Sequence, residues 1–496
     1  MPLIPQDFHA IRNAIAAIPG DVSHDAVGAY APQPADMYAP STHAAALDPT
    51  TPIVIGARGT GKSFWSGVLG QPETLHAAAQ AFPNLKLGDV HVRFGFTAVG
   101  GPAGVNTEAL NQYVSESADV RQAGAFWWAT VVRATLQDAD ESINWGQAVE
   151  TGADWERREE LLAKHDARLR GEGKTLLIVY DALDRITNDW GRRRLLMEAL
   201  LEVVWAMRAY RHLRVKLFLR PDMLEDESLR FVELPKLRAG AVRLTWSSLD
   251  LYGMFFSRLA LSGDDEAKEA FAILLRDLRL PVPNQVDVLS HRWPLTKSKD
   301  TQISVMRVMA GEFMAEGKFG YKKGNTYDWP INHLADAFGE VTPRSFLGLM
   351  IGAAKFGPAP DDRVITANGM LNGLRAASKT RVDQLHQEFA WIKGVLAPLA
   401  GLLMPTKQPD EVYDVWRRAG TIKAVIDDSK NNNYLPPFPI TEGVSEHDLF
   451  IAMRDIGVMS QRMGGRKDPP GYFRIDMPDL YRVAAKLLKK GAPALR

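Results

Sequence analysis

Apolar positions in the first half of the chain occur in short, nearly continuous runs separated by stretches with helical spacing. The runs predict strands at residues 53–55, 90–96, 176–180, 215–219 and 241–246. The stretches between them predict helices at residues 63–69, 106–137, 192–210 and 249–261. Strands that alternate with helices in this way form a parallel sheet covered on both faces. We therefore predict an α/β core whose functional loops lie at the carboxyl ends of the strands.

Outside this core the pattern is mainly helical. Residues 8–18 have helical apolar spacing, and residues 31–51 form a proline-containing arm that either lies against a bound base or is a plain connector. Beyond residue 262 the strand pattern stops, and helices dominate residues 302–403 with an interruption at 317–329. The predicted domains are an N-terminal helix and arm (1–50), the core (51–262), a helical lid (263–365), a helical region (366–440) and a winged-helix-like module (441–496).

The first core strand runs directly into GARGTGKS at residues 56–63, which fits the Walker A pattern G-x-x-x-x-G-K-[ST]. Gly56 and Gly61 let the backbone bend tightly and bring its N–H groups around phosphates. Lys62 can reach the β- and γ-phosphates, Ser63 can ligate Mg²⁺, and the helix that follows directs its positive end at the same anion. The predicted nucleotide-binding residues are Gly56, Arg58, Gly59, Thr60, Gly61, Lys62, Ser63 and Phe64.

An acidic strand end provides the second half of a nucleotide site. Asp181 follows the apolar strand 176–180, where a Walker B carboxylate would hold the water shell of Mg²⁺, so Ser63 and Asp181 are the predicted metal residues. Asp184 either polarises the attacking water or caps a helix. Arg220, at the end of the next strand, either senses the γ-phosphate or forms a structural salt bridge. Arg344, predicted at a helix start behind Pro343, either reaches back over the nucleotide or lies on the surface.

Together these motifs resemble the STAND and KAP-like branch of the AAA+-related P-loop ATPases over about residues 50–350. The matching segments are GARGTGKS, LLIVYDALDR, FLRPD, VRLTWSSLDLYGMFFSRL and GEVTPRSF. The resemblance implies an ASCE-type P-loop NTPase core with a helical lid, with Lys62, Asp181, Asp184, Arg220 and Arg344 in catalytic or sensor roles and with ATP and Mg²⁺ as cofactors. Ala182 stands where AAA+ relatives carry a catalytic Glu, so slow turnover is expected. No membrane helices of the kind that many KAP members insert are visible.

The C-terminal stretch predicts a winged-helix module. Residues 445–462 have helical spacing, 463–470 form a basic loop, 472–475 can form a strand, and 479–490 form a further helix. Such modules bind DNA or pack against other protein domains. The residues that would contact phosphates are Arg462, Arg466, Lys467, Arg474, Lys486, Lys489 and Lys490.

Composition narrows the function classes further. The 496 residues include 59 Lys and Arg against 59 Asp and Glu, so any nucleic-acid or membrane binding must come from a local patch. The absence of Cys excludes disulfides, thiolate zinc sites and Cys nucleophiles. No secretory signal, bilayer-length apolar run, H-E-x-x-H or G-x-S-x-G motif is present, so we expect a soluble cytoplasmic protein that is neither a zinc protease nor a serine hydrolase of that type.

Two functions follow as hypotheses. In the first, the chain is a slowly hydrolysing regulatory ATPase whose nucleotide state controls assembly into a homo-oligomer or with a separate effector protein, in prokaryotic signalling or antiphage defence. In the second, it is an ATP-dependent DNA-binding regulator or initiator that acts through the C-terminal module. A third reading, in which nucleotide is only a structural ligand, is distinguished by whether phosphate is released.

Overall fold

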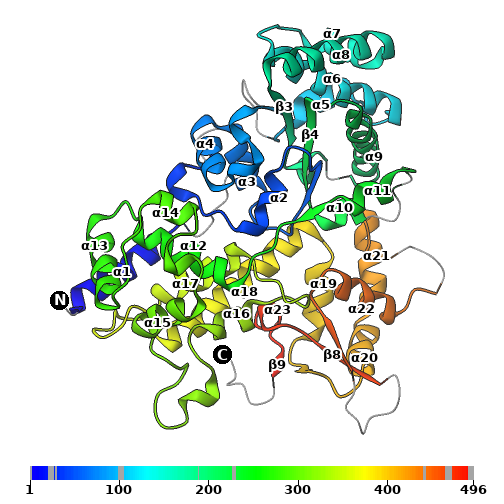
Figure 1. Cartoon of the computed structure of the whole chain (residues 1–496). Coiled ribbons are helices and arrows are strands. Elements are labelled where there is room, and N and C mark those ends of the chain that lie inside the picture. Colours follow the sequence, from blue (N-terminus) through cyan, green and yellow to red (C-terminus); the bar gives the residue numbers. More distant parts are fainter. Residues whose placement is uncertain are drawn as a thin grey trace. The chain divides into compact units, whose positions relative to one another are not determined.

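The computed structural model describes residues 3–19, 27, 31–98, 105–187, 189–225, 229, 231–438, 443–463 and 472–489. The chain divides into two compact units (Figure 1). The sheet unit comprises Val22–Thr245 and Gln285–Ser290, and the helical unit comprises Met1–Asp21, Trp246–Asn284 and His291–Arg496. Helix α12 (Ser248–Ala260), which the sequence analysis assigned to the α/β core, therefore groups with the helical unit.

A five-stranded parallel sheet forms the centre of the sheet unit. Its strand order is β2-β3-β4-β1-β5, with β1 at Ile53–Ile55, β2 at Val90–Phe96, β3 at Thr175–Tyr180, β4 at Leu213–Leu219 and β5 at Val242–Arg243. The predicted parallel α/β core is confirmed. Strand β4 pairs with β1 on one side and with β3 on the other, as expected for the strand that ends at Arg220. Because all strands are parallel, the ends of β1, β3 and β4 share one edge of the sheet.

Both faces of this sheet are covered, and alternate strand residues face different cores. On one face, Ile55, Ile178 and Leu217 pack with residues of α6 (Val120–Asp138), α8 (Trp155–Glu172) and α9 (Trp190–Ala206). On the other face, Val54 and Val179 pack with α3 (Lys62–Gly70), α4 (Pro72–Ala81) and the N-terminal arm. Apolar side chains at every position of β1 are therefore required by burial on both sides.

The remaining elements of the sheet unit are short and connect the strands. Residues 106–137, predicted as one helix, form α5 (Thr107–Tyr113) and α6 instead. The break occurs because the side chain of Asp119 accepts a hydrogen bond from Gln122 N and so caps a new helix start. The other elements are η1 Pro34–Asp36, η2 Ser41–His43, α2 Ala44–Leu47, η3 Pro83–Leu85, η4 Leu87–Asp89, α7 Trp145–Ala153, η5 Leu183–Arg185, η6 Met207–Ala209, α10 Pro221–Glu225, α11 Leu234–Ala239 and α14 Gln285–Leu289.

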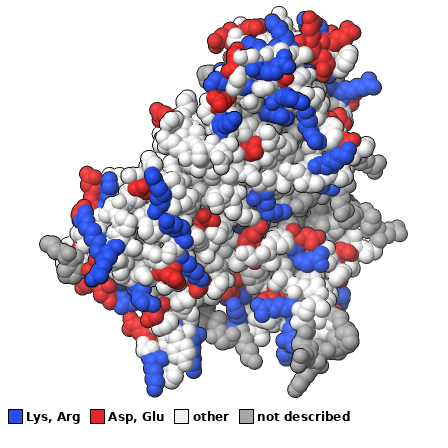
Figure 2. Space-filling model, viewed as in Figure 1, with Lys and Arg blue, Asp and Glu red and all other residues white. Residues whose placement is uncertain are grey.

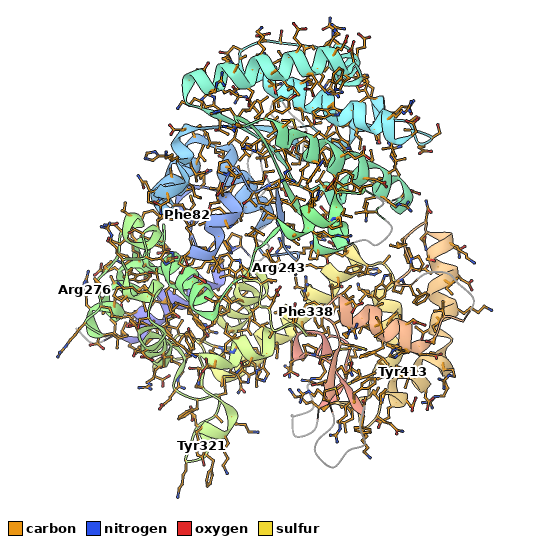
Figure 3. All side chains as sticks on the ribbon, turned by 45° about the vertical axis from the view of Figure 1, so that its right-hand side comes forward. Phe82, Arg243, Arg276, Tyr321, Phe338 and Tyr413 are labelled. Atoms are coloured by element: carbon orange, nitrogen blue, oxygen red, sulfur yellow. The ribbon has the colours of Figure 1, made fainter. Side chains whose placement is uncertain are left out.

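The helical unit contains the N-terminal helix α1 (Pro5–Ala17), which packs against α13 (Asp265–Asp277) and α17 (Pro343–Ala354). The helices are interrupted as predicted at 317–329, but the break begins earlier, after Ala310, and ends at Asp328; it contains η8 (Gly320–Lys323), from which Tyr321 projects (Figure 3). The other helices are η7 Pro294–Thr296, α15 Lys299–Ala310, α16 Asp328–Leu334, α18 Ala367–Glu388, α19 Ile392–Leu396, η9 Ala397–Leu399, α20 Asp410–Ala419 and α21 Thr421–Asn431. Within the described residues, no helix is both long and apolar enough to cross a membrane.

The C-terminal part differs from the predicted winged helix. Helix α22 (Glu446–Asp455) and strand β8 (Phe473–Asp476) match the predicted helix and strand, although the helix ends seven residues early. Residues 460–463, predicted as the helix end and the start of a loop, instead form β7 (Ser460–Met463), which pairs antiparallel with β8. The predicted helix at 479–490 is wrong: α23 spans only Asp479–Arg482, and β9 (Leu488–Lys489) then pairs with β6 (Leu403–Met404). The Arg482 guanidinium donates to Leu487 O, which favours the turn over helix continuation.

Candidate nucleotide site

The segment between β1 and α3 has the backbone geometry of a phosphate-binding loop. Gly59 and Gly61 have φ angles of 87° and 105°, which residues with a Cβ atom rarely adopt. At Gly56 a Cβ atom would overlap the Thr60 hydroxyl, which donates to Ala57 O at 2.8 Å. The Lys62 ammonium lies inside this loop, 2.6 Å from Gly56 O and 3.1 Å from Ala57 O. The loop therefore surrounds a cation and opens at the N-terminus of α3.

The other predicted loop residues lie at its rim or on its helix. Arg58 is partly exposed between the two bends of the loop. Phe64, on the first turn of α3, lies edge-on to Trp65 with ring centroids 5.3 Å apart. Trp65 is fully buried and donates from Nε1 to His43 Nδ1 at 2.9 Å, and His43 Nε2 lies 3.0 Å from Thr245 O. The arm therefore anchors the helix behind the loop, and a contact of the arm with adenine stays a prediction.

Asp181 and Ser63 come together at the carboxyl edge of the sheet. The Ser63 side chain and the charge of Lys62 both act on the Asp181 carboxylate. Burial raises the pKa of Asp181, and the neighbouring Asp184 adds to this effect, whereas Ser63, the Ala182 N–H and Lys62 partly oppose it. A buried carboxylate beside a hydroxyl is a donor set that suits Mg²⁺ and its water ligands. The two residues therefore fit the predicted metal roles.

Arg220 and Asp184 lie at the same edge, but Arg220 is already engaged. Its guanidinium binds Asp222 at two points, Nε to Oδ1 at 3.0 Å and Nη2 to Oδ2 at 2.6 Å, while Nη1 lies 3.8 Å from Asp184 Oδ2. The structural salt bridge that sequence analysis left open for Arg220 is thus present. Asp184 sits in η5 and does not cap α9, because that cap is formed by Asp189. The sensor and water-polarising roles of these two residues stay predictions.

Arg193, on the first turn of α9, was not among the predicted site residues. Its Nη2 donates to Thr187 O at 2.8 Å, while its buried Nε has no hydrogen-bond partner among the described residues. Burial lowers the pKa of Arg193, with Arg220 adding to this effect and Asp222 and Asp184 opposing it. The sequence signal that could have drawn attention to it is three consecutive arginines at 192–194, in the predicted helix that follows the acidic strand end.

Arg344 belongs to the helical unit, where it is the second residue of α17. The predicted helix start is confirmed: Pro343 is the first helical residue, and the Thr342 hydroxyl accepts from Ser345 N at 3.2 Å. Arg344 is half-buried and lines a pocket between α17 and α18. Its predicted reach over the nucleotide stays a prediction.

Two of the four predicted DNA-contacting residues that the structure describes are paired with acids. Arg462 lies 2.6 Å from Asp476 across the hairpin, and Lys489 lies 2.9 Å from Asp479. Figure 2 likewise shows blue and red side chains interspersed on the visible face. Three of the predicted residues, Arg466, Lys467 and Lys490, lie outside the described residues.

Comparisons with known proteins add little to this geometry. No family model and no curated protein sequence matches the chain. A solved structure of the ORC2 protein of Aeropyrum pernix, in complexes with ADPNP and ADP, covers 88% of this chain and 88% of its own, with 11% identity and a TM-score of 0.27. A TM-score that low does not establish a shared fold, so the candidate site is argued from its residues.

Proposed function

We propose that this chain is a regulatory ATPase that binds ATP with Mg²⁺ at the edge of the sheet formed by β1, β3 and β4. The observation that supports this most directly is that Lys62, Ser63 and the buried Asp181 meet there, although the sequence separates the loop from the acid by more than 100 residues. The positive φ values at Gly59 and Gly61 give the tight bends with which a phosphate loop directs its N–H groups at an anion.

Each residue has a defined part in this proposal. The loop N–H groups and the N-terminus of α3 bind the phosphates, and Lys62 neutralises charge on the β- and γ-phosphates. Ser63 and Asp181 hold the metal, which would supply charge stabilisation on the transferred phosphoryl group. Asp184 orients the attacking water, and Arg220 responds to the γ-phosphate by exchanging part of its contact with Asp222 and Asp184. Because Ala182 replaces a catalytic Glu, turnover is slow.

We further propose that nucleotide state controls assembly into a homo-oligomer or with an effector protein, in signalling or antiphage defence. The basis for this step is the motif resemblance to STAND and KAP-like ATPases. Physically, contacts to the γ-phosphate exist only in the triphosphate state, so they favour one conformation over another before hydrolysis. The ATP-dependent DNA-binding alternative has less support, since Arg462 and Lys489 are paired with acids.

The test measures binding and hydrolysis separately on the full chain. Fluorescent ATP should bind to the parent and lose at least about tenfold in affinity in Lys62→Ala, because an ammonium contact to phosphate is removed. Asp181→Asn should retain nucleotide but release phosphate at least about a hundredfold more slowly. Equal binding by parent and Lys62→Ala would disprove the proposed site. Particle mass measured with ATP and with ADP tests the assembly step.

A further inference from the structure

The helical unit contains a pocket that the proposed ATPase does not use. It has a volume of about 210 Å³ and lies between α17 and α18. These two helices run antiparallel and in close contact. A Cβ at Gly373 would overlap Leu349 O, and a Cβ at Gly369 would lie 2.7 Å from Ala353 O, so glycine is needed at both positions. The pocket opens beside this crossing, toward the N-terminus of α17 and the C-terminal half of α18.

The antiparallel register gathers the polar lining at one end. As residue number rises on α17 it falls on α18, so the first turn of α17 lies beside residues near position 380. The polar groups at that end are Arg344, Ser345, Thr380, Arg381 and Gln384. The positive N-terminus of α17, which is 12 residues long, adds to the same end. The rest of the lining is small and apolar, with Lys355 at the far end.

The charge of the lining is one-sided. Among the residues that the structure describes, it holds three basic side chains and no carboxylate. Burial acts to lower the pKa of Arg381, but Tyr481, Glu388 and Asp336 more than offset this and the pKa is raised, so the buried guanidinium is charged. A charged group in such surroundings is costly unless each of its N–H donors finds an acceptor.

One donor of Arg381 lacks such an acceptor. Arg381 is only 5% exposed, and its Nη1 has no hydrogen-bond partner among the described residues. Arg381 also lines the pocket, so its charged guanidinium would attract an anionic ligand there. The helix N-terminus and the unpartnered guanidinium are independent features, and both favour negative charge at the same end.

Gly348 leaves space in the pocket next to the end that holds Arg344 and Arg381. It lies in the middle of α17, where glycine costs about 1 kcal/mol relative to alanine. A Cβ at Gly348 would meet no heavy atom within 4 Å, so the neighbouring helices do not require a glycine there. The space it leaves is part of the pocket. Ala376 and Thr380 are exposed at the opening.

From these observations we propose that the pocket between α17 and α18 binds a small phosphate monoester with an apolar body. The phosphate is bound by the guanidinium groups of Arg381 and Arg344, by the hydroxyls of Ser345 and Thr380, and by the N-terminus of α17. The apolar body lies along Gly348 and Ala376. This site is formed by the helical unit alone and does not depend on the phosphate loop or on the proposed ATPase.

The experiment uses the full chain carrying Lys62→Ala, so that binding at the phosphate loop is suppressed. Calorimetric titration compares phenyl phosphate, inorganic phosphate and phenol as probes. We expect phenyl phosphate to bind about tenfold more tightly than inorganic phosphate, because its ring buries apolar surface, and phenol not to bind detectably. Absence of phenyl phosphate binding, or equal binding of phenol, overturns the proposal.

Three further substitutions locate the site. Gly348→Leu fills the pocket without a steric conflict at Cβ and should weaken phenyl phosphate binding at least about tenfold while the melting temperature is maintained. Thr380→Glu, at the exposed rim, should also weaken phenyl phosphate binding at least about tenfold, because its carboxylate repels the phosphate. This second variant tests the site even if Gly348→Leu fails to fold. Lys379→Gln removes a charge from the same helix outside the pocket and should leave affinity within about twofold. Unchanged binding in both Gly348→Leu and Thr380→Glu, or equal loss in Lys379→Gln, contradicts the assignment.

Discussion

Individual side chains in the sheet unit show how burial and charge are balanced around the phosphate loop. Lys216, on β4, is fully buried, yet its ammonium donates to Asp48 O at 2.9 Å and to Thr51 O at 2.7 Å. These contacts hold the segment that leads into β1 and therefore into the loop. Burial lowers the pKa of Lys216 to about 7, and the nearby Asp48 only partly opposes this effect.

The low pKa of Lys216 predicts a pH-dependent free energy of unfolding. Between about pH 7 and the unfolded pKa near 10.5, the unfolded chain binds a proton at this residue that the folded chain does not. The free energy of unfolding therefore rises with pH across this window, by about 1 kcal/mol per pH unit from this residue. Lys216→Met should remove that slope in urea unfolding at pH 7, 8 and 9. The exposed Lys164→Met serves as control, and a slope unchanged in Lys216→Met would contradict the prediction.

Arg193 is expected to position the groups around Asp184 without binding nucleotide itself. Its charge acts on Arg220, Asp222 and Asp184, and it is fixed by its bond to Thr187 O. Arg193→Gln should slow phosphate release about tenfold with ATP affinity changed less than about twofold, because orientation of a catalytic group affects the reaction step. Arg193→Lys should recover part of the rate.

The neighbouring arginine provides the matched control for this prediction. Arg192 donates to Ser115 O and Val114 O, both at 2.7 Å, and so ties α9 to the end of α5. Arg192→Gln should lower stability but leave the rate of phosphate release per folded molecule unchanged. Equal rate losses in Arg192→Gln and Arg193→Gln would show that Arg193 acts only through the fold.

At the level of elements, helix contacts in the sheet unit depend on particular glycines. A Cβ at Gly152, in α7, would lie 2.7 Å from Ala125 O and 2.8 Å from Ala129 N, backbone atoms of α6 that cannot move aside easily. By contrast, a Cβ at Gly124, in α6 itself, would meet nothing within 4 Å. The two positions form a matched pair within the same helical hairpin.

Opposite effects on stability are therefore predicted for the same substitution. Gly152→Ala should lower the free energy of unfolding by about 1–3 kcal/mol, because it separates the two helices. Gly124→Ala should raise it by about 0.5–1 kcal/mol, because alanine is the better helix former. Urea unfolding of both variants is the measurement. A gain at Gly152 would show that the described α6–α7 contact is incorrect, and a loss at Gly124 would show that this position is not open.

Elements with strong local signals could be predicted from sequence, and those that depend on distant partners could not. The strand at 90–96 was confirmed with its bounds, since its apolar pattern and flanking signals are local. The strand predicted at 241–246 is shorter in the structure, because at the edge of the sheet Val242 and Arg243 pair with β1 and only one further hydrogen bond, from Leu244 N to Ile55 O, extends this pairing. The end of α23 was missed because the turn is favoured by the Arg482 contact and by strand pairing with residues 403–404.

In the candidate site, too, residues with local sequence signals could be predicted and contacts between distant residues could not. The loop at 56–63 and Asp181 could be named from sequence because each follows an apolar strand, and parallel strands bring such ends to one edge. A structural salt bridge of Arg220 was one of two alternatives, but its partner Asp222 could not be named, since a two-residue separation at a strand end does not fix side-chain direction. Arg193 was missed because its role depends on how α9 packs against the ends of β3 and β4.

On the scale of the whole chain, the sheet unit is inserted within the helical unit. Helix α1 belongs to the helical unit, although more than 200 residues separate it from the remainder of that unit in the sequence. Ile11 and Ile15 are fully buried, and Arg12 donates to Phe356 O at 2.7 Å, Gly357 O at 3.0 Å and Val364 O at 3.2 Å. The N-terminal segment is thus part of a core rather than a separate domain of its own.

This arrangement predicts that a destabilising substitution in α1 lowers the local stability of the helical unit and leaves that of the sheet unit unchanged. Ile11→Ala should cost about 2–5 kcal/mol by leaving a cavity against α13 and α17. Hydrogen exchange should then accelerate in peptides from α13 and α17, whereas peptides covering residues 53–69 of the sheet unit keep their protection and ATP affinity is unchanged. Ile4→Ala, at a residue that is 51% exposed, is the control and should change exchange in neither unit. Equal acceleration at residues 53–69 would mean that the two units unfold together, because a cavity confined to one core would otherwise affect only that core.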